Sequence, residues 1–446
     1  MFDREINKQL ESWSVKPDRK PLVLRGARQV GKTTLVKNFA KKYDCFIYLN
    51  LEKEDQRRLF VAEGSFAQKL EAIFFLSEKQ RNPGHLILIF IDEIQYSPEA
   101  VQLLRYFYEE SPEIHVIVAG SLLETMINRH ISFPVGRVEY LAVRPCSFTE
   151  FLNATGNQTA LEVLQKWPFP EYAHSQLSAL FNRYALIGGM PAVLASYAKE
   201  NDLIALRSVY LSLIAGYSDD VEKYAGSNSS VKYIRHILRT GFGYTCQRIK
   251  FERFGESDYR SREVSEAFQI LEKTMLLELV YPTTSAQVPL LPNFKKSPRL
   301  HWLDTGLVNF AAGVQQEVFG VSDLRAAWKG AIAEHIVGQE LIVNDTNILS
   351  HRTFWVREAK NSNAEVDFII NCNGLIIPIE VKSDSGNTLK SLHLLMDQLN
   401  HDLAVRVWDR PFKIDAVETP AGKKFRLLSI PYYLVYQIPK IIKNHL

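Results

Sequence analysis

Glycine, lysine and threonine occur between residues 26 and 34 at a spacing that suits phosphate chemistry. The stretch reads Gly-Ala-Arg-Gln-Val-Gly-Lys-Thr-Thr and matches the pattern G-x-x-x-x-G-K-[ST]. Glycines let the backbone wrap around an anion, Lys32 would reach the β- and γ-phosphates of a nucleotide, and the Thr33 hydroxyl would ligate Mg²⁺. The alternative is a glycine-rich turn that matches by accident. The predicted nucleotide-binding residues are Gly26, Ala27, Arg28, Gln29, Val30, Gly31, Lys32, Thr33 and Thr34.

Two carboxylates follow an apolar run further along the chain. Residues 86–91 read Leu-Ile-Leu-Ile-Phe-Ile and are followed by Asp92 and Glu93. Such a run is typical of a strand buried on both faces of a parallel sheet, and ligands bind at the carboxyl ends of such strands. Asp92 would hold Mg²⁺ through water, and Glu93 would be the base that orients the attacking water. The alternative is a strand that simply ends in charge.

The last third of the chain contains a second group of charged residues. Residues 365–370 and 375–382 are predicted strands, and a type I′ turn at Asn373-Gly374 would pair Cys372 with Leu375 and place Asp367 opposite Glu380. Glu380 and Lys382 are two residues apart and therefore share a face. A predicted helix over residues 325–343 adds Glu334 on a face of mostly small residues, where a carboxylate needs a partner.

The elements that would position the first group are a strand, a loop and a helix. The apolar run Pro21 to Leu24 precedes the glycines, and a helical pattern begins near Leu35. Further strands are predicted at 46–50, 115–120 and 135–141, with a helix beginning at Ser97-Pro98.

With these motifs the chain resembles the bacterial and archaeal P-loop ATPases of the AAA+ type that carry a C-terminal DUF4143 region. The resemblance covers nearly the whole chain and rests on residues 26–34, 91–95, 118–121, 136–137, 144–151, 303–307, 365–367 and 379–382. It implies ATP and Mg²⁺ as cofactors, with Walker A at residues 26–34 and Walker B at Asp92. It also implies a homo-oligomer as a possible state.

The resemblance further implies roles for single polar residues. Ser121 takes the place of sensor 1, although a helix N-cap is an equal alternative. Arg137 is the candidate arginine finger, with Arg129 and Arg144 as rivals and a solvated surface arginine as the alternative. Arg4 would lie near the adenine, although a plain structural helix at the N-terminus explains it as well.

The C-terminal charges resemble the PD-(D/E)xK nuclease constellation of Holliday-junction resolvases and restriction enzymes. Glu334, Asp367 and Glu380 would hold one or two Mg²⁺ ions, and Lys382 would orient or activate the hydrolytic water. DNA is the partner that this resemblance implies. The alternative is a charged hairpin on an inactive nuclease fold, in a nucleotide-switched scaffold that docks DNA or protein.

The predicted fold is an α/β multidomain chain. We expect a P-loop core with a parallel sheet at 1–155, a helical lid at 156–225, a winged-helix-like unit at 226–299 and an α/β restriction-endonuclease-like domain at 300–446. In the third unit, Val264, Phe268, Leu271 and Met275 would form one helical stripe. Arg260 and Arg262 precede it, where they would touch DNA or serve only a structural role.

Composition limits the other classes of function. The chain has 446 residues, 46% of them hydrophobic and 23% charged, with a net charge of +3. This charge is too small to indicate nucleic-acid binding by itself, and a chain of this length needs more than one core. The N-terminus lacks a secretory signal, and no apolar run is long enough for a membrane span. Scattered cysteines fit a reducing cytoplasm and predict neither zinc nor disulfides.

Overall fold

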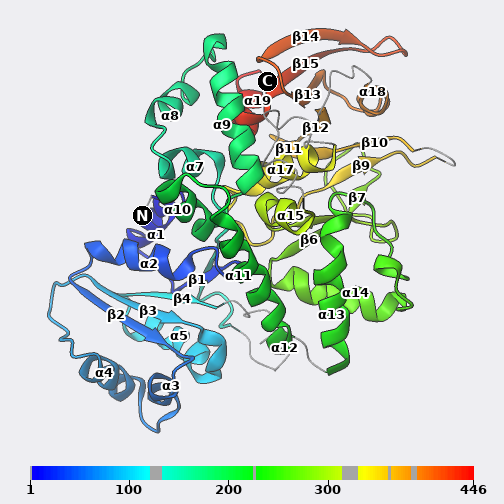
Figure 1. Ribbon diagram of the computed structural model, residues 1–446. Coiled ribbons are helices and arrows are strands. Elements are labelled where there is room, and N and C mark those ends of the chain that lie inside the picture. The colour runs from blue at the N-terminus through cyan, green and yellow to red at the C-terminus, as the bar shows by residue number, and fades with distance from the viewer. Residues whose placement is uncertain are drawn as a thin grey trace.

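The N-terminal part is built around a parallel sheet (Figure 1). The predicted phosphate-binding loop follows one of its strands, β1. The computed structural model describes residues 3–120, 133–224, 228–313, 330–359, 363–382 and 389–445. The sheet has five strands in the order β2-β3-β4-β1-β5, and all its pairings are parallel. These strands are β1 (Leu22–Arg25), β2 (Cys45–Asn50), β3 (Ile87–Asp92), β4 (Ile114–Ala119) and β5 (Glu139–Ala142).

Helices cover both faces of this sheet. Every residue of β3 and β4 is buried, as the unbroken apolar runs predicted. Ser97 caps the helix that begins at Pro98, also as predicted. The predicted strand at 135–141 is displaced, because β5 begins only at Glu139. The helices of this part are α1 (Asn7–Ser14), α2 (Lys32–Phe39), α3 (Glu54–Val61), α4 (Phe66–Leu76) and α5 (Pro98–Glu110).

A helical segment follows the sheet, and it includes the range in which a helical lid was predicted. Its first helix begins with a capping box, in which Ser147 and Glu150 exchange side-chain and backbone hydrogen bonds. The helices are α7 (Phe148–Ala154), α8 (Gln158–Leu164), α9 (His174–Ile187), α10 (Pro191–Glu200), α11 (Leu206–Asp219) and α12 (Val221–Tyr224).

The next segment contains two packed helices and short strands. Val264, Phe268 and Leu271 are buried on one face of α14, as predicted, but Met275 is not on this helix. The helix ends at Lys273, and Met275 has a φ of +60° and packs against the core of the parallel sheet. The elements are α13 (Asn228–Thr240), α14 (Ser261–Lys273), β6 (Leu277–Val280), β7 (Pro282–Thr283), β8 (Arg299–Trp302) and α15 (Thr305–Ala311).

The C-terminal part is a mixed sheet in the order β11-β12-β13-β15-β14, with parallel pairing of β12 with β13 and of β13 with β15. Cys372 pairs with Leu375 around Asn373-Gly374, so the predicted hairpin register is confirmed. The elements are α17 (Ala331–Ile342), β9 (Phe354–Val356), β10 (Glu365–Val366), β11 (Phe368–Cys372), β12 (Leu375–Lys382), α18 (Lys390–Met396), β13 (Leu403–Trp408), β14 (Lys413–Glu418), β15 (Lys424–Pro431) and α19 (Ile438–Lys443).

One hydrophobic core joins the helical segment to the C-terminal sheet. It runs from Cys146 to Ile442 and includes residues of α9, α14, α17 and β12. In addition, β8 pairs antiparallel with β6, from Val280 opposite Arg299 to Leu277 opposite Trp302, across the predicted boundary at residue 299. The last two predicted units therefore share a sheet and a core. Within the described ranges, none of the helices combines the length and the apolar character that crossing a membrane requires.

Candidate functional site

The phosphate-binding loop connects the carboxyl end of β1 to the first turn of α2. Gly31 is the N-cap of α2 and has a φ of +91°, a left-handed conformation that glycine adopts without strain. Gly26 lies against the next loop, where a Cβ atom would overlap the carbonyl oxygen of Val143. Both glycines of the pattern are therefore required by the backbone itself.

Lys32 lies inside this loop. Its Nζ donates hydrogen bonds to the carbonyl oxygens of Gly26 (2.8 Å) and Ala27 (2.9 Å). Burial lowers the pKa of Lys32 to about 8, although Glu93 and Asp92 attract its positive charge. Phosphate oxygens are charged and therefore stronger acceptors than these carbonyls. A bound nucleotide can thus replace the carbonyls as partners of the ammonium group.

This pKa predicts a pH dependence of nucleotide binding. Phosphates favour the charged ammonium, so binding must raise the pKa of Lys32 from about 8 and take up a proton at higher pH. Affinity should fall as pH rises above 8, by up to about tenfold per pH unit. Titration calorimetry in buffers of different ionisation enthalpy measures this proton uptake. Lys32→Arg keeps its charge over this range and should remove the effect, whereas an unchanged pH dependence in Lys32→Arg would assign it to another group.

Thr33 and Asp92 meet at the carboxyl ends of the strands. The Thr33 hydroxyl donates to Asp92 Oδ2 at 2.7 Å, and the Tyr48 hydroxyl donates to the same oxygen at 3.3 Å. The two predicted Mg²⁺ ligands are thus neighbours. Tyr48 was not predicted, although its place near the end of β2, next to β3, put it within reach of Asp92.

Glu93 follows Asp92 directly and has a left-handed backbone with a φ of +52°. A non-glycine residue in this region is uncommon and costs free energy, which is typical of functional sites. Its amide donates to Asp92 Oδ1 at 3.1 Å, and the Gln95 side chain donates to its carboxylate. The Glu93 carboxylate also attracts the Lys32 ammonium, so it belongs to the same site.

The helical segment reaches the phosphate-binding loop directly. Arg28 forms an ion pair with Asp220, which follows α11, and the Tyr217 hydroxyl donates to the Arg28 carbonyl oxygen at 3.1 Å. Asp220 is buried. These contacts join the phosphate-binding loop to the end of α11.

The predicted arginines have different surroundings. Arg4 is buried and donates to Glu150 Oε1 (2.9 Å), to the Val30 carbonyl (3.2 Å) and to the Arg144 carbonyl (2.8 Å), which favours its structural role. Arg137 lies in a half-exposed turn, where it forms an ion pair with Glu109. Ser121 and Arg129 lie outside the described residues.

The C-terminal charged residues come together, but around a cation that the sequence did not predict. Arg299 of β8 donates to Glu334 Oε1 and to Glu365 Oε2, each at 2.7 Å, and its Nη1 lies 3.6 Å from Asp367 Oδ1. Lys382 pairs with Glu380 Oε1 at 2.7 Å. The Val381 amide donates to Asp367 Oδ2 at 2.8 Å. Val381 directly follows Glu380, which the predicted hairpin register places opposite Asp367.

We call Glu334, Glu365, Asp367, Glu380, Arg299 and Lys382 the carboxylate cluster. One guanidinium serves three carboxylates, and Glu380 Oε2 is buried without a hydrogen-bond partner among the described residues. Burial, followed by repulsion from Asp367, raises the pKa of Glu380. Burial also raises the pKa of Glu334 and of Asp367, and the attraction of Arg299 offsets this only in part. The cluster therefore has four carboxyl groups for two cations, and the raised pKa values show that full ionisation of these acids is disfavoured.

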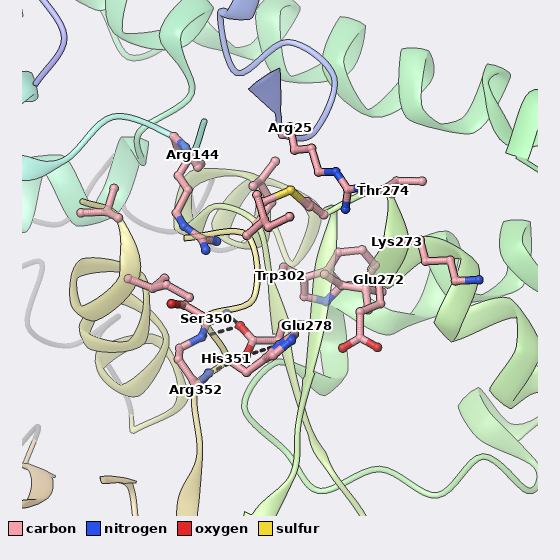
Figure 2. Close-up of a pocket in the computed structure, with 18 of the residues that line it drawn as sticks. Arg25, Arg144, Glu272, Lys273, Thr274, Glu278, Trp302, Ser350, His351 and Arg352 are labelled. Atoms are coloured by element: carbon pink, nitrogen blue, oxygen red, sulfur yellow. Dashed lines mark hydrogen bonds and ion pairs between the residues drawn. The ribbon is translucent and has the colours of Figure 1, made fainter. Parts of the chain in front are cut away.

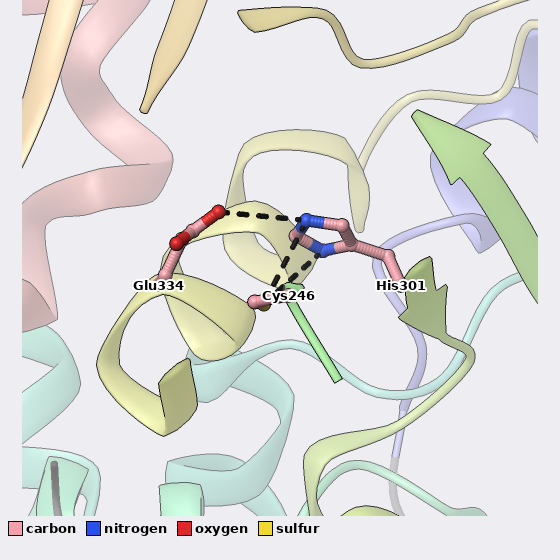
Figure 3. Close-up of side chains that lie close together, drawn as sticks. All are labelled: Cys246, His301 and Glu334. Carbon is pink, nitrogen blue, oxygen red and sulfur yellow. Dashed lines mark hydrogen bonds and ion pairs between the residues drawn. The ribbon is translucent and has the colours of Figure 1, made fainter. Parts of the chain in front are cut away.

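A buried thiol and imidazole lie next to this cluster (Figure 3). His301 Nε2 is 3.8 Å from Glu334 Oε1, and Cys246 Sγ is 3.7 Å from Nε2 and 3.9 Å from Nδ1 of the same ring. Burial raises the pKa of the Cys246 thiol and lowers that of His301, so both groups are neutral. Glu334 is already paired with Arg299, and the trio is therefore a neutral packing contact behind the cluster.

Three family models match separate parts of the chain. An AAA domain matches residues 18–152, a domain of unknown function (DUF8612) matches residues 178–318, and a domain of unknown function (DUF4143) matches residues 329–425. A comparison with curated proteins found no match.

Among solved structures, the chain is similar to the Walker-type ATPase PABY2304 of Pyrococcus abyssi, with 16% identity, 70% of this chain and 96% of that chain covered, and a TM-score of 0.44. It is also similar to the Aeropyrum pernix Orc1 protein in complex with DNA, with 13% identity, 72% and 95% covered, and a TM-score of 0.32. The Thermotoga maritima RuvB Holliday junction branch migration motor matches with 14% identity, 63% and 90% covered, and a TM-score of 0.27. With the geometry of the phosphate-binding loop, the family models identify an AAA-type P-loop domain joined to a DUF4143 region.

Proposed function

We propose that this chain is a Mg²⁺-dependent ATPase that acts on DNA through its C-terminal half. The ATPase proposal rests on one observation. Lys32 and Thr33, in the first turn of α2, lie near Asp92 at the end of β3, with 2.7 Å between the Thr33 hydroxyl and Asp92 Oδ2. This is the set of groups that phosphoryl transfer requires, namely an ammonium, a hydroxyl and a carboxylate.

Each residue has a distinct role in this proposal. The amides of the loop and the first turn of α2 surround the phosphates, and Lys32 leaves the Gly26 and Ala27 carbonyls to neutralise them. Thr33 and Asp92 would hold Mg²⁺, which neutralises the charge that develops on the transferred group. Glu93 takes a proton from the attacking water. Arg28 links this chemistry to the lid through Asp220.

Two features support DNA as the macromolecular partner. Arg262, in the first turn of α14, has a side chain that is 87% exposed, and such a helix in a winged-helix-like unit can meet a phosphate backbone. The carboxylate cluster has the residue types of a metal-dependent nuclease, with Lys382 beside Glu380.

Arg299 supports a second candidate, a nucleotide-switched scaffold whose nuclease fold is inactive. Its guanidinium already lies between Glu334, Glu365 and Asp367, where a catalytic metal would compete with it. A cleavage assay separates the two candidates. Linear and branched DNA should be nicked by the full chain with Mg²⁺ or Mn²⁺, and an Asp367→Asn chain should be inactive. If no DNA form is cleaved under conditions in which ATP is hydrolysed, the scaffold is the better proposal.

The candidate arginine finger predicts a dependence on assembly. Arg137 is half-exposed and pairs with Glu109, so it would be available to a neighbouring subunit once it leaves Glu109. ATPase activity per chain should rise with protein concentration, and Arg137→Ala should remove this rise and lower the rate roughly 10³-fold. Arg58→Gln, at an exposed position of α3, is the control. Full activity of Arg137→Ala at every dilution would show that Arg137 is not the finger.

A further inference from the structure

A cavity of about 310 Å³ lies where the parallel sheet, the α14–β6 segment and the C-terminal part meet (Figure 2). Its lining includes Arg25 and Gly26 at the end of β1, residues 272–275, 277 and 278, and residues 348–352. Lys32, Thr33, Asp92 and Glu93 are not among its described lining residues. The cavity is therefore a different space from the proposed nucleotide site, although the two share the Gly26 backbone.

The cavity has the composition of a small-molecule site. Met275, Leu277, Leu303 and Val343 provide apolar walls, and charged side chains enter from two sides. Ligand pockets in proteins begin at about 300 Å³, occur often at the interfaces of domains, and combine apolar walls with a few polar groups. A ligand of roughly the size of a nucleoside monophosphate would fill this volume.

Arg144 is the feature that indicates the charge of the ligand. Its Nε donates to the Asp345 carbonyl at 3.0 Å and its Nη2 to the Asn347 carbonyl at 3.5 Å. Among the described residues, no carboxylate lies within ion-pair distance of it, whereas Arg352 on the opposite wall has Glu278 at 2.8 Å. Burial lowers the pKa of Arg144, and the attraction of Glu278 and Asp345 offsets this only in part.

The two sides of the cavity differ in their charged groups. Figure 2 shows Arg144 and Arg25 on the side of the parallel sheet, with Glu278 held by Arg352 and His351 on the far side. Lys273 is exposed, and burial raises the pKa of Glu272. Arg144 is therefore the lining cation that could meet a ligand anion, and a guanidinium can donate two parallel N–H groups to one phosphate.

We infer that this cavity binds a small phosphorylated molecule, with its phosphate against Arg144 and its apolar body against Met275, Leu303 and Val343. This inference goes beyond the proposed ATPase and does not depend on it. Because the ligand would touch segments that are distant in the sequence, its binding would stabilise their arrangement.

The test uses the full-length chain with Lys32→Ala, so that the phosphate-binding loop cannot account for the result. The probes are phenyl phosphate, inorganic phosphate and phenol, and the measurements are titration calorimetry and thermal unfolding. Phenyl phosphate should bind and raise Tm by about 2 °C or more at concentrations far above its Kd. Inorganic phosphate and phenol should each bind at least about tenfold more weakly, because each offers only one of the two contacts.

Substitutions locate the site. Arg144→Gln should weaken phenyl phosphate binding about tenfold or more, and Arg144→Lys should restore part of it. Leu349 lines the cavity and is 73% exposed, so Leu349→Glu should fold normally and repel the phosphate. Arg58→Gln, at an exposed position of α3, is the matched control and should change nothing. Equal binding by the parent, Arg144→Gln and Leu349→Glu chains, or no binding of phenyl phosphate by the parent, would overturn the inference.

Discussion

ATP binding should be lost when Lys32 is replaced with alanine. The side chain is already aimed into the loop, at 2.8 Å and 2.9 Å from the carbonyls that define its inner surface. Removal of two charge-assisted hydrogen bonds, at about 1.5–3 kcal/mol each, should weaken binding roughly 100-fold or more. Titration calorimetry with ATP and Mg²⁺ measures the loss, and circular dichroism verifies the fold. A Kd within a few-fold of the wild-type value would mean that Lys32 does not contact the phosphates.

Glu93→Gln should separate binding from turnover. The amide keeps the size of the side chain and can still accept from Gln95, but it cannot take a proton from water. Hydrolysis should therefore fall by a factor of roughly 10²–10⁴ while ATP still binds. Glu52→Gln, an exposed position after β2, is the matched control. If Glu93→Gln hydrolyses ATP at the wild-type rate, another residue is the base.

The nucleotide site could be predicted from the sequence because its groups are set by short-range rules. The glycine spacing, the buried run before Asp92 and the Ser97-Pro98 helix start all depend on neighbours within a few residues. The contacts that join parts of the chain could not be predicted in this way. Arg28 lies in the phosphate-binding loop and Asp220 directly after α11, so the two residues are far apart in the sequence. No local pattern marks such a pair.

Arg299 was missed for the same reason. It lies at the start of β8, far along the chain from Glu334 and Asp367, and it reaches them only because β8 pairs with β6 and packs beside α17. The pattern of α17 was also misleading. The sequence predicted a face of mostly small residues with Glu334, yet His335, Gln339 and Glu340 are also buried, since their polar atoms bond to Thr305 and Tyr184. A polar side chain can be buried in the core when its polar atoms have hydrogen-bond partners of this kind.

The raised carboxylate pKa values predict how stability depends on pH. An acid whose pKa is higher in the folded protein binds more protons there than in the unfolded chain, so stability falls as pH rises between the two values. Burial raises the pKa of Glu340 to about 8, and burial also raises those of Glu334, Asp367 and Glu380. Stability should therefore fall between about pH 5 and pH 8, by up to about 1.4 kcal/mol per pH unit for each such group.

A divalent cation should oppose this loss if the carboxylate cluster binds metal. Mn²⁺ favours the ionised carboxylates, so its stabilisation of the full chain should grow as pH rises from 6 to 8, to about 2.7 kcal/mol at 100 times its Kd. Urea unfolding at each pH, with and without Mn²⁺, measures the effect. Asp92→Asn, which removes the proposed metal ligand of the nucleotide site, is the background in which that site cannot mask the effect.

Substitutions then distinguish the cluster from other buried acids. Glu380→Gln and Asp367→Asn should remove the Mn²⁺ effect, whereas Lys382→Ala should keep it and lose DNA cleavage. Glu340→Gln is the matched control, because Glu340 shares α17 with Glu334 but accepts from Tyr184 (2.7 Å) and from the Phe148 amide (3.2 Å) instead of joining the cluster. It should reduce the pH dependence and leave the Mn²⁺ effect intact. Stability that is independent of Mn²⁺ at every pH would mean that Arg299 is the cation of this site, and the scaffold proposal would then replace the nuclease.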